Sequence, residues 1–276
     1  MFMRYPGGLG KALTFSYDDG VEQDRELIRI LDEHGMKGTF NINSGLYAPE
    51  GHAWPEGQVH RRMTKQQCIE LYKNSGHEVA IHCLKHESLV ELPAAMMTHE
   101  VMADRVNLEA EYGGIIRGMA YPFGTFNDTA VQVLKNCGVL HARTVISSHG
   151  FAIPNDWLRL PATCHHNDPR LMELADKFVK MDTPLSSQLF YLWGHSYEFE
   201  GDNNWQVIRD FCDRMAGHED IWYATNGEIF TYIEAWCKLI ASADGKRVYN
   251  PTTTTLWFKD AKGIKAVAPD ETVDAE

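Results

Sequence analysis

The chain has 276 residues and a formal net charge of −12, and 44% of its residues are hydrophobic. This length suits one large domain, and the hydrophobic content supplies enough material for a sizeable core. The negative charge argues against nucleic acid as a partner, because a phosphate-binding surface needs clustered Lys and Arg.

No apolar run approaches the ~20 residues that a membrane-spanning helix needs, so we expect no membrane partner. Residues 1–10 lack the apolar region of a signal peptide, and the cysteines are scattered without a Cys-x-x-Cys pair. These features predict reduced thiols and a cytoplasmic protein, although a secreted protein whose leader has been removed would look the same. The sequence does not indicate an oligomeric state.

Short apolar strands alternate with amphipathic helices along most of the chain. The predicted strands cover 11–17, 37–43, 78–83, 116–123, 140–146, 187–195 and 221–226. The predicted helices start near residue 22 and then cover roughly 64–75, 93–112, 127–136, 169–181, 204–216 and 227–240. Strands that alternate with helices imply parallel pairing through right-handed crossovers. About seven such units predict an α/β protein with a distorted (β/α)7-type barrel.

The pattern changes after Ala241, where stretches rich in Thr and Val are typical of β-hairpins. We therefore expect the β/α barrel to occupy residues 1–240 and a small C-terminal β element to occupy residues 241–276. The final stretch, DETVDAE, is polar and is expected to be a frayed tail.

Residues suited to metal binding or acid–base chemistry follow several predicted strands. Asp18 and Asp19 end the first strand, His82 ends the third with His86 four residues later, and His195 ends a later strand. The carboxyl ends of barrel strands share one face, so these side chains are expected to converge there. An isolated Asp-Asp-Gly turn does not predict such a convergence. The His-x-x-x-His spacing also brings two imidazoles within reach of one ion if the chain turns helical.

These segments resemble a known family. ALTFSYDDG, GHEVAIHCLKH, YPFG and WGH occur in the order and spacing of the polysaccharide deacetylase (NodB-homology) family, which is carbohydrate esterase family four. The resemblance covers roughly residues 11–240. It implies a hydrolase that uses a divalent metal ion and a water molecule to remove an acetyl group from an N-acetylated carbohydrate.

The resemblance also implies roles for individual residues. Asp19, His82 and His86 would be the metal ligands, Asp18 the general base and His195 the general acid. The metal implied is most often zinc, with Co²⁺, Ni²⁺, Mn²⁺ or Fe²⁺ as other options. The oxyanion would be held by the metal and by a backbone N–H just after the YPFG motif.

The chain departs from the family pattern at one important point. The family's Arg-Pro-Pro-Tyr motif has an arginine where this chain has Ala120. Arg143 and Arg159 are two candidates for the charged partner that would orient the base. Trp193 could wall the pocket for the acetyl methyl group or belong to the core. The residues expected to bind substrate are Tyr121, Pro122, Phe123, Trp193 and Arg143.

The connection at 44–62 is rich in Gly and Pro and is expected on the face that carries the strand ends. Its Tyr47 and Trp54 would either stack on a sugar ring or pack on the barrel as parts of a lid. The segment at 163–168 could add His165 or His166 to the rim of the site, although surface histidines are the default expectation there.

The same residues are also compatible with two other classes of function. Two histidines and one carboxylate also form the facial triad of non-haem iron oxygenases, although those sites need neither a second carboxylate nor a separate acid. A catalytically impaired carbohydrate-binding barrel is the other alternative, because the motif arginine is missing. The expected substrate is an N-acetylated small molecule or oligosaccharide, and the sequence does not name it.

Overall fold

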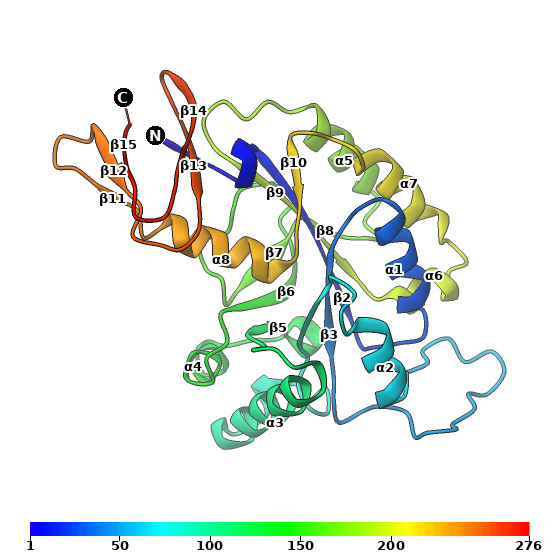
Figure 1. Ribbon diagram of the computed structural model, residues 1–276. Helices are drawn as coiled ribbons and strands as arrows, with labels where there is room; N and C mark the ends of the chain where they lie inside the picture. The colour runs from blue at the N-terminus through cyan, green and yellow to red at the C-terminus, as the bar shows by residue number, and fades with distance from the viewer. Residues whose placement is uncertain (276) are drawn as a thin grey trace.

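A parallel sheet forms the centre of the molecule in the computed structural model of the chain, which describes residues 1–275 (Figure 1). Its strands are β2 (Lys11–Asp18), β3 (Gly38–Ile42), β4 (Glu78–Ile81), β5 (Gly118–Ala120), β6 (His141–Ser147), β7 (Leu160–Ala162), β8 (Cys164–His165), β9 (Gln188–Gly194) and β10 (Ile221–Tyr223). The strand order is β7-β6-β5-β4-β3-β2-β9-β8, and β10 pairs with the start of β2. Each of these strands lies within or close to a predicted strand except β7 and β8, which the sequence analysis missed.

The two ends of this sheet meet on one short segment. Thr163 alone separates β7, which pairs with β6, from β8, which pairs with β9. The N–H of Thr163 donates to the carbonyl of Tyr191 at 2.8 Å, and its carbonyl accepts from the N–H of His149 at 2.9 Å. The sheet therefore curves into a barrel-like shape, and the predicted α/β class with a (β/α)7-type arrangement is confirmed.

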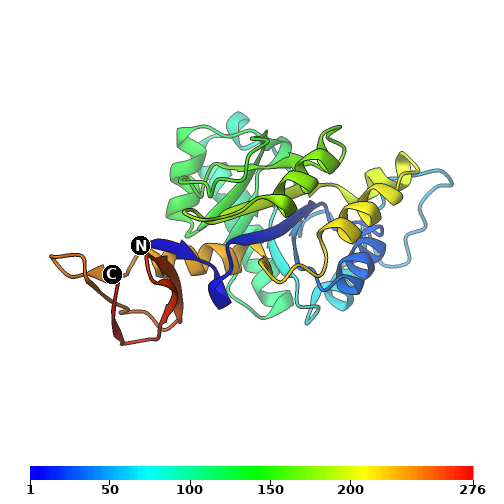
Figure 2. The same ribbon diagram turned by 90° about the horizontal axis from the view of Figure 1, so that it is seen from above.

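Helices surround the sheet, as Figures 1 and 2 show. They are α1 (Asp24–Glu33), α2 (Lys65–Tyr72), α3 (Ala94–Tyr112), α4 (Asp128–Asn136), α5 (Leu171–Lys180), α6 (Ser196–Gly201), α7 (Gln206–Met215) and α8 (Asn226–Trp236), with 3₁₀ turns at Pro6–Gly8, Leu89–Glu91 and Pro122–Gly124. A capping box forms at the start of α2, where Thr64 accepts from the Gln67 N–H. Within residues 1–275, none of the helices combines the length and the apolar character that crossing a membrane would require.

Two small antiparallel sheets follow the barrel. Their strands are β1 (Phe2–Arg4), β11 (Ile240–Ala241), β12 (Arg247–Tyr249), β13 (Leu256–Asp260), β14 (Gly263–Val267) and β15 (Thr272–Asp274). β1 pairs with β13, so the start of the chain joins this C-terminal β element, and the two termini lie near each other in both views (Figures 1 and 2). Residues for which the sequence predicts a frayed tail form β15, which pairs with β12.

The polar residues singled out in the sequence gather at one end of the central sheet. Asp18 is the last residue of β2, His82 directly follows β4, and His195 directly follows β9. Arg143 lies in β6, on the opposite side of the barrel-like sheet from β2. The expected convergence of strand ends therefore occurs.

Candidate active site and metal centre

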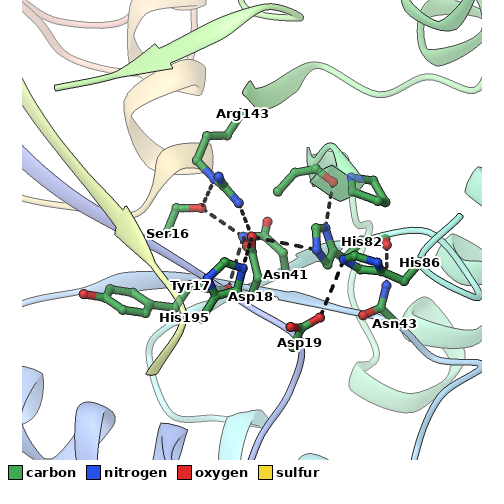
Figure 3. A network of polar contacts seen from close by, with 12 residues as sticks. Ser16, Tyr17, Asp18, Asp19, Asn41, Asn43, His82, His86, Arg143 and His195 are labelled. Carbon is green, nitrogen blue, oxygen red and sulfur yellow. Dashed lines mark hydrogen bonds and ion pairs between the residues drawn. The ribbon is translucent and has the colours of Figure 1, made fainter. Parts of the chain in front are cut away.

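Asp19, His82 and His86 form one cluster. Their ligating atoms all lie within 4.8 Å of one another. The Nε2 atom of His86 is 3.9 Å from Oδ1 of Asp19, and the two imidazole rings are 4.8 Å apart between centroids. Figure 3 shows the two rings pointing toward the carboxylates at the end of β2. The structure thus brings together the residues that the sequence analysis assigned as metal ligands.

The protonation of His82 suits a metal ligand. Its Nδ1 lies 2.8 Å from the carbonyl of Ala120, which can only accept a hydrogen bond, so Nδ1 carries the proton. The other nitrogen, Nε2, is buried and has no hydrogen-bond partner among residues 1–275. A neutral imidazole with its proton on Nδ1 presents a lone pair at Nε2. Together with a carboxylate and a second histidine, this donor set fits a divalent metal ion such as zinc.

The backbone at this cluster adopts conformations that non-glycine residues rarely use. The φ angle is +86° at Asp19, +63° at Cys83 and +56° at His86. Such left-handed residues are disfavoured and persist where the surrounding structure holds them, often at functional sites. Asn43 supplies part of that restraint, because its Nδ2 donates to the carbonyls of His82 and Cys83.

Asp19 also contacts two residues that the sequence analysis did not assign to the site. Nε2 of His60 lies 3.2 Å from Oδ2 of Asp19, and an Nη2 of Arg62 donates to Oδ1 at 2.8 Å. Burial opposes ionisation of Asp19, but the hydrogen bond from His60 and the charge of Arg62 outweigh it, so the pKa of Asp19 is held far below its usual value. Both partners come from the end of the 44–62 segment, and no local signal marks them.

Asp18 is held by a different set of partners. Its Oδ2 accepts a short hydrogen bond from Arg143, and its Oδ1 accepts from Nδ2 of Asn41 at 2.8 Å. Nε2 of His82 and Nε2 of His195 lie 3.7 and 3.8 Å from the same Oδ2 atom. Burial opposes ionisation, but the charge of Arg143 and smaller contributions from the two histidines lower the pKa of Asp18. Asp18 is therefore an ionised carboxylate between the two imidazoles.

Arg143 is the arginine that reaches the site. Its side chain is 1% exposed, and its Nε donates to Oγ of Ser16 at 3.1 Å. Its guanidinium lies 4.4 Å from the ring of Trp193, which is itself buried. Arg159, the other sequence candidate, instead forms ion pairs with Asp128 and Asp156 at the surface. A guanidinium from β6 therefore contacts Asp18 although the motif position holds Ala120.

His195 faces Asp18 with one nitrogen and Glu198 with the other. Its Nδ1 lies 2.9 Å from Oε1 of Glu198, in the first turn of α6. Burial disfavours the imidazolium form, but the hydrogen bond with Glu198 and the nearby carboxylate charges outweigh it and raise the pKa of His195. Glu198 also faces Nε2 of His165 at 3.2 Å and Nε2 of His166 at 2.9 Å. The expectation that His166 is a surface residue is wrong, since its side chain is fully buried.

Gly194 provides the space that this histidine group needs. A Cβ atom at Gly194 would lie 2.0 Å from Nδ1 of His166, which stacks on Phe199. We expect Gly194→Ala to lower the free energy of unfolding by about 1–3 kcal/mol, because overpacking a buried site displaces its neighbours. Urea denaturation measures this, with Gly114→Ala as the control because Gly114 has open space around it. Equal stability of the two variants would contradict the expected clash.

Comparison with known proteins identifies the family. A family model described as polysaccharide deacetylase matches residues 7–142, which include Asp18 and the cluster of Asp19, His82 and His86. The chain belongs to the polysaccharide deacetylase family. No curated protein sequence matches the chain significantly.

Several solved structures resemble this chain, and the first two below support the fold. A protein from Mycobacterium smegmatis assigned to the polysaccharide deacetylases is 18% identical with a TM-score of 0.58, and the match covers 84% of this chain and 93% of that one. A family 4 carbohydrate esterase from Streptomyces lividans, in complex with acetate, is 14% identical with a TM-score of 0.52 over 78% and 93% of the two chains. A Streptococcus pyogenes deacetylase in complex with acetate is 23% identical with a TM-score of 0.46, and the match spans 53% of this chain and 61% of that one.

The YPFG motif of this family member is mostly buried. The Tyr121 side chain is 1% exposed and its hydroxyl donates to the carbonyl of Leu158 at 2.8 Å, and Pro122 is also buried. Phe123 is 63% exposed, and its ring centroid lies 4.6 Å from that of His86. Only Phe123, of the three, presents its side chain at the metal cluster.

The N–H groups at the end of the motif are not free to act as the expected oxyanion donor. The N–H of Thr125 donates to the carbonyl of Pro122 at 3.3 Å, and the N–H of Gly124 donates to the carbonyl of Tyr121 at 2.9 Å. Both groups are therefore occupied within the turn. The N–H of Phe123 has no acceptor among residues 1–275, which makes it the donor that this turn leaves open.

The 44–62 segment packs on the barrel at its start. The Tyr47 hydroxyl donates to Oε2 of Glu111 at 2.6 Å, and its ring packs against the main core. Trp54 contacts His52 with ring centroids 4.5 Å apart. For Tyr47 these contacts favour the packing interpretation over stacking on a sugar.

Proposed function

We propose that this family member is a metal-dependent hydrolase that removes the acetyl group from an N-acetylated carbohydrate. Family membership supports removal of an acetyl group. The proposal rests chiefly on one juxtaposition at the end of β2. The potential metal ligands Asp19, His82 and His86 lie on one side of the ionised Asp18. His195 and Arg143 approach Asp18 from other directions (Figure 3).

The residues that would hold the cation are Asp19, His82 and His86. A divalent ion bound there, with zinc as the first choice, would polarise the acetyl carbonyl and lower the pKa of a water molecule. Phe123 lies beside His86, so its free N–H is suited to donate a hydrogen bond to the oxyanion that forms when water attacks the carbonyl carbon. Its exposed ring is suited to contact the substrate at the rim.

Asp18 acts as the general base in this proposal. It is ionised, because Arg143 and Asn41 stabilise its negative charge through hydrogen bonds. It takes a proton from the attacking water while the water oxygen bonds to the acetyl carbon. Arg143 and Trp193 are buried around the base, so we propose that they orient it and wall the site.

His195 completes the reaction from the other side of Asp18. Its protonated Nε2 donates to the leaving amine nitrogen as the C–N bond breaks, which yields acetate and a free amine. Glu198 holds Nδ1 and favours the imidazolium form that this step requires. An amine needs a proton to leave far more than an alkoxide does, and this favours N-acetyl over O-acetyl substrates.

Acetate release and metal content together separate this proposal from its alternatives. Zinc together with acetate release supports the deacetylase, and iron together with oxygen uptake supports a facial-triad oxygenase. The absence of both results supports a carbohydrate-binding barrel. Loss of activity within this fold has a precedent, since one solved structure is of a CE4 family pseudoenzyme mutant with restored enzymatic activity. The retention of Asp18 and His195 in mutual proximity speaks for an active site here. A panel of N-acetylated sugars and non-sugar amides would identify the substrate class.

Loss of the metal is expected to abolish acetate release. His82→Ala removes a buried ligand whose Nε2 has no hydrogen-bond partner among residues 1–275, so the variant should lose the tightly bound metal and at least about 1,000-fold in kcat/KM. Metal analysis and an acetate assay before and after chelation measure both effects, and added Zn²⁺ should restore the chelated wild type but not the variant. His99→Ala, at an exposed position of α3, is the control. Full activity in metal-free wild type would contradict the proposed metal centre.

A further inference from the structure

Each of the two adjacent carboxylates has its own guanidinium. Arg143 contacts Asp18, and Arg62 contacts Asp19. Nη2 of Arg62 lies 2.8 Å from Oδ1 of Asp19, and its Nη1 donates to the backbone carbonyl of Asp19 at 2.7 Å. The Asp19 side chain is 7% exposed and that of Arg62 14% exposed, so water screens this ion pair only weakly.

Arg62 is also tied to the histidine side of the cluster. Its Nη1 donates to Oδ1 of Asn43 at 2.8 Å, and Nδ2 of Asn43 donates in turn to the carbonyls of His82 and Cys83. One guanidinium is therefore hydrogen-bonded to Asp19 directly and to the His82 segment through one side chain. Its position does not depend on side-chain contacts alone.

The backbone that carries Arg62 is paired with the chain that follows β2. Arg62 forms an antiparallel bridge with Val21, and the N–H of Met63 donates to the carbonyl of Gly20 at 3.0 Å. The neighbouring Arg61 points elsewhere and forms ion pairs with Glu22 and Glu200. The end of the 44–62 segment is thus fixed over the site with one arginine facing Asp19 and the next one facing away.

The positive charge of Arg62 has opposite effects on two quantities. It stabilises the site without metal, and it lowers the affinity of the site for a metal ion. Without metal, Asp19 would be a buried carboxylate beside a second carboxylate, and the guanidinium supplies its counter-charge. The same Oδ1 atom lies 3.9 Å from Nε2 of His86, so a cation bound by this pair would share the carboxylate with a fixed positive charge. Repulsion between the two cations weakens metal binding.

We propose that Arg62 is a built-in counter-ion of Asp19, which stabilises the metal-free site and keeps the affinity for the metal lower than the three ligands alone would give. This inference rests on the proposed metal centre and adds a residue that sets its affinity. The effect belongs to the charge of Arg62, because its position is fixed by the backbone pairing of residues 20–22 with 61–63.

The test measures Zn²⁺ binding and thermal stability, and it needs no substrate. Arg62→Gln keeps a hydrogen-bond donor but removes the charge, and Arg62→Lys keeps the charge but loses the fork of donors. We expect Arg62→Gln to lower the Kd for Zn²⁺ about tenfold, to lower the Tm of the metal-free protein, and to enlarge the rise of Tm on adding Zn²⁺. Arg62→Lys should keep a Kd within about threefold of wild type. Competition with a chromophoric chelator measures Kd, and circular dichroism measures Tm.

Arg61→Gln is the matched control, because it removes an equal charge from the adjacent residue without touching Asp19. Its Kd for Zn²⁺ should stay at the wild-type value. Weaker or unchanged Zn²⁺ binding in Arg62→Gln would overturn the inference, as would equal tightening in Arg61→Gln. Absence of Zn²⁺ binding by the wild type would instead contradict the metal centre itself. If Arg62→Gln does not fold, a twofold or smaller drop of Kd in Arg62→Met overturns the inference.

Discussion

Replacement of Asp18 by Asn is expected to lower kcat/KM for N-acetyl hydrolysis by about 1,000-fold while the metal content stays unchanged. Asn cannot accept the proton of the attacking water, whereas the ligands Asp19, His82 and His86 are untouched. The variant is nearly isosteric and still accepts from Asn41 through its amide oxygen. Acetate release and metal analysis on the same preparation measure the two quantities.

The neighbouring aspartate provides the contrast for this experiment. Asp19→Asn should lose both metal and activity, because it weakens a ligand rather than the base. Asp18→Asn also leaves the buried Arg143 without its counter-charge, so some loss of stability is expected, and the assay belongs well below the Tm of the variant. Activity near the wild-type level in Asp18→Asn, or loss of metal from it, would show that the two roles are assigned to the wrong residues.

Replacement of Arg143 by Met is expected to lower kcat/KM by about 100-fold at neutral pH. Arg143 outweighs the burial of Asp18 and lowers the pKa of this carboxyl. Without the guanidinium that pKa rises, so the base becomes protonated at a higher pH than in the wild type. The acidic limb of the kcat/KM profile should therefore move to higher pH. Loss of one partner of a buried ion pair should also lower the free energy of unfolding by about 3–5 kcal/mol.

Arg159→Met is the control for this prediction, because Arg159 forms ion pairs with Asp128 and Asp156 at the surface and does not contact Asp18. Its activity and pH profile should match the wild type. A pH–rate profile and urea denaturation of both variants provide the measurements. Full activity in both would remove the idea that an arginine from elsewhere replaces the one missing at Ala120.

Much of this fold can be predicted from local sequence patterns. The helix α2 begins at a capping box, which is a local sequence pattern, and the apolar residues Leu27, Ile28 and Leu31 recur at helical spacing in α1 and are buried. The exceptions depend on contacts between distant segments. β1 pairs with β13 across almost the whole chain, and the break at Thr163 divides one short stretch between two neighbouring strands. Neither stretch shows the alternation of a regular strand, so its pairing cannot be inferred from periodicity.

The cluster at the strand ends was also predictable, for a topological reason. Asp18, His82 and His195 lie at or directly after the ends of β2, β4 and β9, and parallel strands with right-handed crossovers bring such ends to one face. The residue types then indicate the chemistry. The resemblance to deacetylases refined this to roles, which remain proposals for measurement.

The sequence by itself determined the α/β alternation and the identities and convergence of Asp18, Asp19, His82, His86 and His195, because local patterning and strand topology decide both. Only the tertiary structure decided which charges surround them. Arg143 and Asp18 are 125 residues apart, and Arg62 and Asp19 are 43 apart. Which arginine reaches which carboxylate depends on strand register and on the path of a long loop. Both are properties of the packed chain, because the sequence around a single charged residue has no periodic pattern that identifies the residue it contacts.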